Sequence, residues 1–239
     1  MRRTNKDSVG DESAIENGYA LRLRCISPLH EIPGFDRLSH KKFYPKGSVI
    51  LVEGHSARGV YVLCSGRVKF SITSPEGKAL IVRIGRPGDL LGIHATLAGH
   101  PYEATAETLA PCRVDFISRK DLLLLLERQK SSGLGLAMAI SKDFTEFVEH
   151  ARVLLLSGSA AEKLARLLLR LGDEFGEPTK TGIRLQTFLT HEEIAQMIAA
   201  SRETVTRVLG EFRRRHIISL TDHGILVRNR KGLESVARY

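Results

Sequence analysis

The hydrophobic pattern of this chain changes near residue 118, and this change constrains the fold more than any other feature of the sequence. Between residues 41 and 117, apolar residues form short alternating runs at 48–52, 60–63, 68–72 and 80–84. Glycines separate these runs at spacings that suit the tight turns of an all-β sandwich or barrel. After residue 118 the apolar residues recur every three or four positions, which is typical of helices. The sequence therefore predicts the α+β class, with an all-β N-terminal half and a mainly helical remainder.

A long amphipathic helix is predicted from about residue 132 to residue 156, after a shorter helix that Ser118 caps. Its apolar positions form an a/d seam over three heptads. The seam consists of Leu134, Ala137, Ser141, Phe144, Val148, Ala151 and Leu155. This face either packs on its own β domain or pairs with a second copy of the chain. Its length favours the second interpretation, a homodimer.

Residues 157–159, Ser-Gly-Ser, interrupt the helical pattern and mark a hinge. A further amphipathic helix is expected from residue 160 to about 174, where Gly176 and Pro178 end it. Later, Thr190 and Glu193 have the spacing of a capping box, which begins another helix. The chain therefore has a second domain that starts near residue 158.

Two short helices joined by a tight turn follow the capping box. Ala199 and Ala200 form the turn, and Ser201 can cap a second helix that extends to about residue 215. This arrangement is a helix-turn-helix. A hairpin over residues 217–227 comes next and has the position of a wing.

The charge of the chain favours a polyanionic partner such as double-stranded DNA. There are 36 Lys and Arg against 27 Asp and Glu, a net charge of +9. Arg202 and Arg207 offer guanidinium forks that match guanine, and Glu203 can accept a hydrogen bond from cytosine. The residues predicted to contact DNA phosphates are His191, Ser201, Thr204 and Thr206. The alternative is that these side chains form an ordinary solvated surface.

The segments Leu189–Ala195 and Ser201–Leu209 resemble the helix-turn-helix signature of the Crp/Fnr family of bacterial transcription regulators. The order of elements is also similar, from about residue 25 to residue 235. The resemblance implies a flexible leader (1–24), a β-roll similar to cyclic-nucleotide-binding jelly rolls (25–130), a dimerisation helix (131–157) and a winged helix-turn-helix (158–239). It further implies that Arg202, Glu203 and Arg207 read a palindromic TGTGA-like operator, and that RNA polymerase is a second partner.

The β-roll departs from its cyclic-AMP-binding relatives at two places. Those relatives use a Gly-Glu pair for the ribose and an Arg-Ser/Thr-Ala run for the phosphate, whereas this chain has Gly92-Ile93 and Ala104-Thr105-Ala106 there. A lost charge-assisted phosphate contact removes about 1.5–3 kcal/mol. We therefore expect no useful affinity for cyclic AMP, and the effector is not identified.

The oxygen-sensing branch of the family offers a second comparison. Cys25 and Cys112 resemble two of its cluster cysteines, but Glu16 and Tyr19 occupy the other two positions. Because an iron–sulfur cluster normally requires four thiolates, none is expected. A redox pair of Cys25 and Cys112 remains an alternative to two packing thiols. His94 and His100 are expected to be solvated, so no metal site is predicted.

Other functional classes fit the sequence less well. The chain contains no nucleophile motif, no Gly-Lys-Ser/Thr phosphate loop and no HExxH, so an enzyme is not expected. A regulatory module that acts on a protein partner is the remaining alternative to DNA binding. A polar start, three scattered cysteines and the lack of any apolar run of eighteen residues together favour the cytoplasm over secretion or a membrane.

Overall fold

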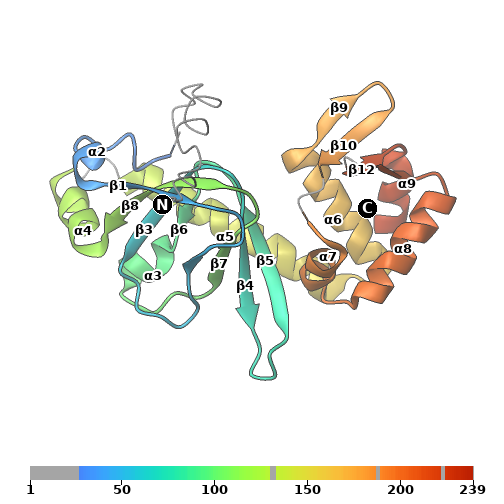
Figure 1. The fold of residues 1–239 in the computed structure, drawn as a ribbon, viewed down its shortest axis with the longest axis horizontal. Coiled ribbons are helices and arrows are strands. Elements are labelled where there is room, and N and C mark those ends of the chain that lie inside the picture. The colour runs from blue at the N-terminus through green and yellow to red at the C-terminus, as the bar shows by residue number, and fades with distance from the viewer. Residues whose placement is uncertain (1–26, 130–132, 187–188, 222–223, 239) are drawn as a thin grey trace, which may run out of the picture.

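The computed structural model describes residues 27–129, 133–186, 189–221 and 224–238. These residues form an N-terminal β-roll and a C-terminal helical unit, which a long helix connects (Figure 1). This architecture confirms the predicted fold class. The expected leader (1–24) and Cys25 lie outside the described residues.

Two four-stranded antiparallel sheets form the β-roll in the described part of the chain. The first has the order β1-β8-β3-β6, with bounds His40–Tyr44, Cys112–Ser118, Gly59–Ser65 and Leu90–Leu91. The second has the order β2-β7-β4-β5, with bounds Val49–Leu51, Thr105–Thr108, Val68–Thr73 and Ala79–Gly85. Alternate residues of the strands point inward and form the core. Four of these strands lie where the alternating runs predict them.

Short helices close the β-roll. They are α2 (Phe35–Leu38), α3 (Ile93–Ala98) and α4 (Arg119–Arg128). The Ser118 side chain accepts a hydrogen bond from the backbone N–H of Asp121, at 3.1 Å, and so caps α4 as predicted. Leu122 and Leu125 of this helix are buried against Phe35 and Ile117 in one apolar cluster.

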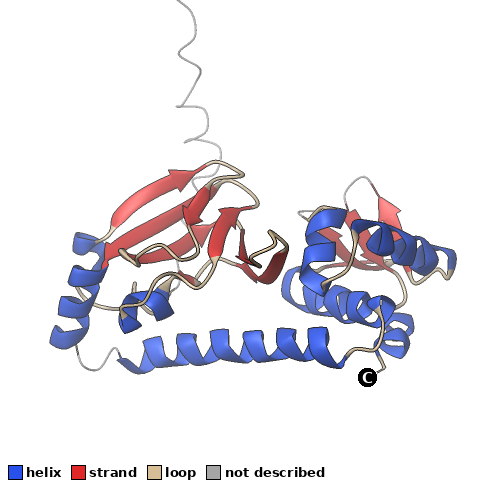
Figure 2. Ribbon diagram, turned by 90° about the horizontal axis from the view of Figure 1, so that it is seen from below, coloured by secondary structure: helices blue, strands red, loops and turns tan. Residues whose placement is uncertain are grey.

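The long helix α5 (Gly133–Leu156) lies along one side of the β-roll and ends beside the C-terminal unit (Figure 2). Leu136 and His150 are its buried residues. The predicted seam lies on the outer side, where Leu134, Phe144 and Leu155 are 71%, 65% and 79% exposed. Ala137 and Ser141 are also exposed, and Val148 and Ala151 are half-buried. No helix within the described ranges has both the length and the apolar character needed to cross a membrane.

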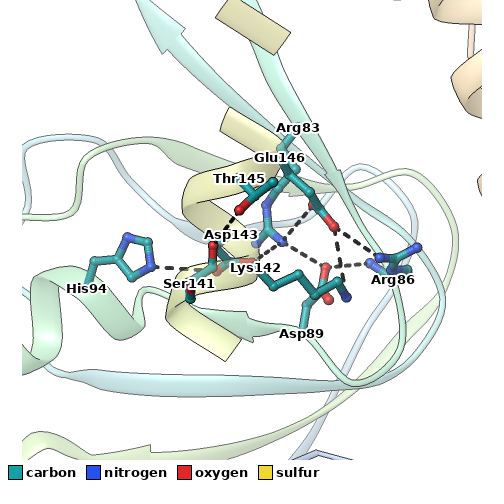
Figure 3. A network of polar contacts seen from close by, with 9 residues as sticks. All are labelled: Arg83, Arg86, Asp89, His94, Ser141, Lys142, Asp143, Thr145 and Glu146. Atoms are coloured by element: carbon teal, nitrogen blue, oxygen red, sulfur yellow. Dashed lines mark hydrogen bonds and ion pairs between the residues drawn. The ribbon is translucent and has the colours of Figure 1, made fainter. Parts of the chain in front are cut away.

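A network of ion pairs fastens the middle of α5 to the β-roll (Figure 3). The Arg83 guanidinium on β5 donates to Asp89 at 3.0 Å and to Asp143 of α5 at 2.9 Å. Arg86 donates to Glu146 of α5 at 3.0 Å. Burial raises the pKa of Asp143, an effect that the charge of Arg83 opposes. These contacts determine which face of α5 meets the β-roll and which remains free.

The C-terminal unit contains more structure than the sequence pattern predicts. Helix α6 (Ala160–Phe175) ends where expected, but a strand that contains Pro178 follows its C-cap, Gly176, directly. A four-stranded sheet has the order β11-β12-β10-β9, with bounds Ile218–Thr221, Gly224–Val227, Gly182–Gln186 and Glu177–Thr179. Only β11 and β12 were predicted, and the turn residues 222 and 223 lie outside the described residues. A final helix, α9 (Arg230–Ala237), was also unpredicted and packs on α6.

His150 supports a prediction about pH. It is 3% exposed, between the backbone of Ile81 on β5 and Arg170 on α6, whose guanidinium donates to its Nδ1 at 3.3 Å. Burial, and then the charge of Arg170, lowers the pKa of His150 to about 4.

The unfolded chain therefore takes up this proton near pH 6.5, and the folded protein only near pH 4. The neutral His150 therefore contributes to the free energy of unfolding, and this contribution is fully present above pH 6.5. As the pH decreases from 6.5 to 4, the free energy of unfolding should fall by up to roughly 3 kcal/mol. Chemical denaturation at several pH values measures this. His150→Gln should flatten the dependence and the exposed-residue control His55→Gln should not; equal slopes in all three proteins would contradict the assignment.

Candidate nucleic-acid interface

Two capped helices form the predicted helix-turn-helix. Helix α7 (His191–Ile198) begins with a complete capping box: the Thr190 side chain accepts from the N–H of Glu193 at 3.1 Å, and the Glu193 carboxylate accepts from the N–H of Thr190 at 2.8 Å. Ala199 has φ 50°, which reverses the chain at the turn. Helix α8 (Arg202–Arg214) begins at the predicted cap, Ser201.

Apolar packing fixes the angle between the two helices. The buried residues of α7 are Ile194, Ala195, Met197 and Ile198, and those of α8 are Val205, Val208, Leu209 and Phe212. All eight belong to one cluster that also includes α6 and the winged sheet. Because this face of α8 is buried in the core, the opposite face remains available to a ligand.

The three predicted base-reading residues lie together on the exposed face of α8. Arg202, Glu203 and Arg207 are all exposed. Hydrogen bonds from its own backbone N–H and from Ser201 lower the pKa of Glu203, so this carboxylate is ionised at neutral pH. The face thus presents two guanidinium donors and one carboxylate acceptor within the first two turns.

The predicted phosphate contacts form two hydrogen-bonded pairs. Nδ1 of His191 lies 3.0 Å from Oγ1 of Thr206, which donates to the carbonyl of Arg202 at 3.0 Å. Ser201 and Thr204 pair through their hydroxyls at 3.0 Å. The structure thus places His191, Ser201 and Thr204 at the N-terminal ends of α7 and α8, where backbone N–H groups favour anions, and Thr206 one turn further along α8. Their contact with phosphate stays a prediction.

Further along the same face lie two arginines that are not among the predicted DNA contacts. Arg213 and Arg214 in the last turn are exposed and extend the basic surface. A Cβ added at Gly210 would meet nothing within 4 Å. Glycine weakens a helix interior by about 0.5–1 kcal/mol relative to alanine. Since packing does not require Gly210, its small size leaves room beside the helix.

The β-roll contacts the helix-turn-helix directly. Nζ of Lys69 on β4 donates to the Glu193 carboxylate at 2.9 Å and pairs with Glu107 at 3.3 Å. Ile81 and Ile84 of β5 join the apolar cluster of the C-terminal unit, and β5 faces α7 (Figure 1). Although burial raises it, hydrogen bonds from Thr190 and Lys69 hold the pKa of Glu193 below its ordinary value. Sequence reasoning missed Lys69, which is 124 residues from its partner.

The two departures from the cyclic-AMP pattern lie in apolar surroundings. Ile93 is 2% exposed and begins α3, and Ala106 is fully buried on β7. Tyr102, which lies between these residues in the sequence, donates its hydroxyl hydrogen to the carbonyl of Gly59 at 2.8 Å. A Cβ at Gly92 would come within 2.5 Å of the Tyr102 ring. The residues that the resemblance places at the ribose and phosphate positions are thus buried and uncharged, and the loss of cyclic AMP affinity stays a prediction.

The remaining candidate residues are spread over the β-roll. Cys112 is fully buried and its thiol donates to backbone carbonyls, and burial raises the pKa of this thiol. Reactive thiols have lowered pKa values and solvent access, so the environment of Cys112 suits packing. Redox pairing with Cys25 stays a prediction. Nε2 of His94 lies 3.7 Å from Asp143, and His100 is exposed.

Comparisons with known families agree with this geometry. Residues 41–129 match the model of the cyclic nucleotide-binding domain, and residues 162–236 match that of the Crp-like helix-turn-helix domain. The two matched segments correspond to most of the β-roll and to the unit that carries α7 and α8.

Relatives with both parts cover most of the chain. A global nitrogen regulator of Synechococcus elongatus is 30% identical over 196 residues, which are 78% of this chain and 84% of the relative. A CRP-like cAMP-activated global transcriptional regulator of Mycobacterium tuberculosis is 27% identical, over 82% of this chain and 87% of the relative. The crystal structure of a CRP-family transcriptional regulator from Thermus thermophilus has a TM-score of 0.65 and 27% identity, over 83% of this chain and 97% of that chain. This chain therefore belongs to the Crp/Fnr family of DNA-binding transcription regulators.

Proposed function

We propose that this regulator binds, as a homodimer, a palindromic operator whose half-sites resemble TGTGA. One observation carries the proposal: α8 is a capped helix whose inner face is completely buried and whose outer face presents Arg202, Glu203 and Arg207. We further propose that it acts in the cytoplasm, without enzymatic activity, and that RNA polymerase is its second partner.

The chemistry of the outer face supports readout of G·C pairs. In the major groove guanine offers O6 and N7 as acceptors, which match the donor fork of Arg202 or Arg207. Cytosine offers an N4 donor, which an ionised Glu203 can accept. Ser201 and Thr204 lie at the positive end of the helix dipole, where hydroxyl and N–H donors can bind a phosphate and fix the register.

The outer face of α5 supports the homodimer. Met138, Phe147 and Leu156 are 55–75% exposed beside the predicted seam residues, so a continuous apolar stripe faces away from the β-roll. A second copy would cover this stripe. Two-fold symmetry would then place the two α8 helices in successive major grooves, about 34 Å apart.

For the β-roll we propose that neither cyclic AMP nor an iron–sulfur cluster is the effector. The Mycobacterium tuberculosis relative is described as cAMP-activated. In this chain, however, the resemblance places Ile93 where those relatives have the ribose-binding carboxylate, and this buried side chain has no group to accept a ribose hydroxyl. Cys112, one of the two cysteines that resemble cluster ligands, is enclosed by backbone carbonyls.

Substitution of Arg202 tests DNA readout. Arg202→Ala should weaken operator binding by roughly 1–3 kcal/mol and relax the preference at one G·C pair, because a bidentate contact is lost. Selection of bound duplexes from a random pool, at stated salt, measures both effects. Arg113→Ala, which removes an equally charged exposed side chain on β8, should change neither. An unchanged base preference in Arg202→Ala would show that Arg202 contacts only phosphate.

Substitution of Phe144 tests the homodimer. Phe144→Glu should weaken dimerisation at least about tenfold, since two carboxylates would meet across the seam. Phe43→Glu on β1 is a matched control, because Phe43 is 62% exposed and Phe144 is 65% exposed. Sedimentation equilibrium of both variants measures the association. A Phe144→Glu protein as dimeric as the control would remove the seam assignment.

Calorimetry tests the exclusion of cyclic AMP. Titration of the full chain should show no binding at micromolar nucleotide, because the contacts that an Arg and a Glu would supply are worth about 1.5–3 kcal/mol each. The matched variant Ile93→Glu supplies the ribose-binding carboxylate but not the phosphate-binding arginine. Micromolar binding by the natural chain would contradict the proposal.

A further inference from the structure

Three potential metal ligands from distant parts of the sequence meet on one face of the sheet β1-β8-β3-β6. His30 lies in the turn before α2, Cys64 on β3 and Asp115 on β8. Their ligand atoms all lie within 4.8 Å of one another. Nε2 of His30 is 2.9 Å from Oδ2 of Asp115. Within the described ranges, no other group of three or more His, Cys, Asp or Glu side chains converges in this way.

The pairing of β3 with β8 explains why Cys64 and Asp115 share a face. Val62 pairs with Asp115, and the register shifts between Leu63 and Ser65, so Cys64 is the extra residue of a β-bulge. Residues two apart on a strand point to the same side. Cys64 therefore lies on the side of Val62, and of Asp115 opposite it.

The turn that carries His30 is held in place by its own apolar residues. The N–H of His30 donates to the carbonyl of Ser27 at 3.0 Å, and Leu29, Ile32 and Phe35 are at most 3% exposed. The imidazole also packs edge-on against Phe35, with ring centroids 4.8 Å apart. The position of His30 over the sheet is thus fixed by the core.

The surroundings of the three side chains suit an ion more than solvent. Cys64 and Asp115 are each 6% exposed, and the side chain of His30 is 16% exposed. Nδ1 of His30 is buried and makes no hydrogen bond to any described residue. The contact with Asp115 therefore uses only one of the two ring nitrogens of His30. A buried carboxylate such as that of Asp115 is costly in free energy unless it is paired or bound to a metal.

We propose that His30, Cys64 and Asp115 bind a divalent transition-metal ion, for which Zn²⁺ is the best match. Zinc prefers this mixture of imidazole, thiolate and carboxylate, whereas calcium and magnesium prefer oxygen alone. Donor atoms around a tetrahedral zinc are about 3.3–3.8 Å apart, so the His30–Asp115 contact opens slightly and Cys64 closes in. Binding removes the proton of the Cys64 thiol and leaves a fourth position for water.

This site is separate from the proposed operator binding, and its position gives it a structural effect. Leu29, Ile32 and Phe35 of the His30 turn share one apolar cluster with Leu136, which lies in the first turns of α5. An ion that ties His30 to β3 and β8 stabilises this cluster. Zinc binding should therefore raise the melting temperature of the full chain.

Metal titration of the chelator-treated full chain tests the proposal. Zinc, in competition with a chromophoric chelator, should bind at one equivalent. Cobalt(II) as a spectroscopic substitute should give a thiolate charge-transfer band and the visible bands of tetrahedral coordination. Cys64→Ser should abolish the charge-transfer band, and Asp115→Asn and His30→Gln should each lower zinc affinity at least about tenfold.

Matched variants identify which thiol binds the metal. Cys112→Ser removes a second buried cysteine of the same domain, and Cys25→Ser removes the third cysteine of the chain; both should keep the band. Operator binding by each variant, measured in parallel, shows that it is folded. The proposal is overturned if the natural chain binds no zinc while it still binds DNA, or if the band survives Cys64→Ser and disappears in Cys25→Ser.

Discussion

The position of α5 depends on the ion pairs of Arg83, and most of the functional geometry depends on the position of α5. The Arg83 side chain is 16% exposed, stacks over the Phe70 ring at 4.5 Å and bridges Asp89 of the β-roll and Asp143 of the helix. Charges this far from water are stable only when they are paired. Without Arg83, both carboxylates would lose their guanidinium partner; Asp89 would keep the backbone N–H of Arg86, and Asp143 would keep Nε2 of His94, 3.7 Å away. The ion pairs therefore hold α5 with one face on the β-roll and leave the opposite face exposed.

A second contact connects the β-roll to the DNA-binding unit without using α5. Glu193 has two structural roles, because it closes the capping box of α7 and also accepts the hydrogen bond from Lys69. Arg67, which immediately precedes β4, lies over the Phe175 ring at 5.4 Å. A rotation of the C-terminal unit away from the β-roll would thus break an ion pair at the start of the helix-turn-helix. The orientation of α8 is therefore coupled to β4 and β5 as well as to the hinge after α5.

The sequence predicts what depends on near neighbours and misses what depends on distant ones. Thr190, Glu193 and Ser201 act within three residues of their partners, so their caps were predictable, as was the periodicity of α5. Strand β9 was missed because Gly176 and Pro178 are typical of a helix end; Pro178 is compatible with a strand here because β9 is an edge that pairs only with β10. Contacts between residues 34–124 positions apart leave no local sequence pattern. The Lys69–Glu193 ion pair and the cluster of His30, Cys64 and Asp115 are of this kind.

Three groups spaced seven residues apart hold the inner face of α5 along its length. Leu136 packs in the cluster of the His30 turn, Asp143 binds Arg83, and His150 lies between β5 and α6. Seven residues are nearly two helical turns, so all three lie on one face, roughly opposite the seam. The β-roll and α6 therefore contact α5 at defined points along its length. In the proposed homodimer, the seam on the other face would set the distance between two copies of α8, so the contacts that orient α5 would also affect how well the pair fits successive major grooves.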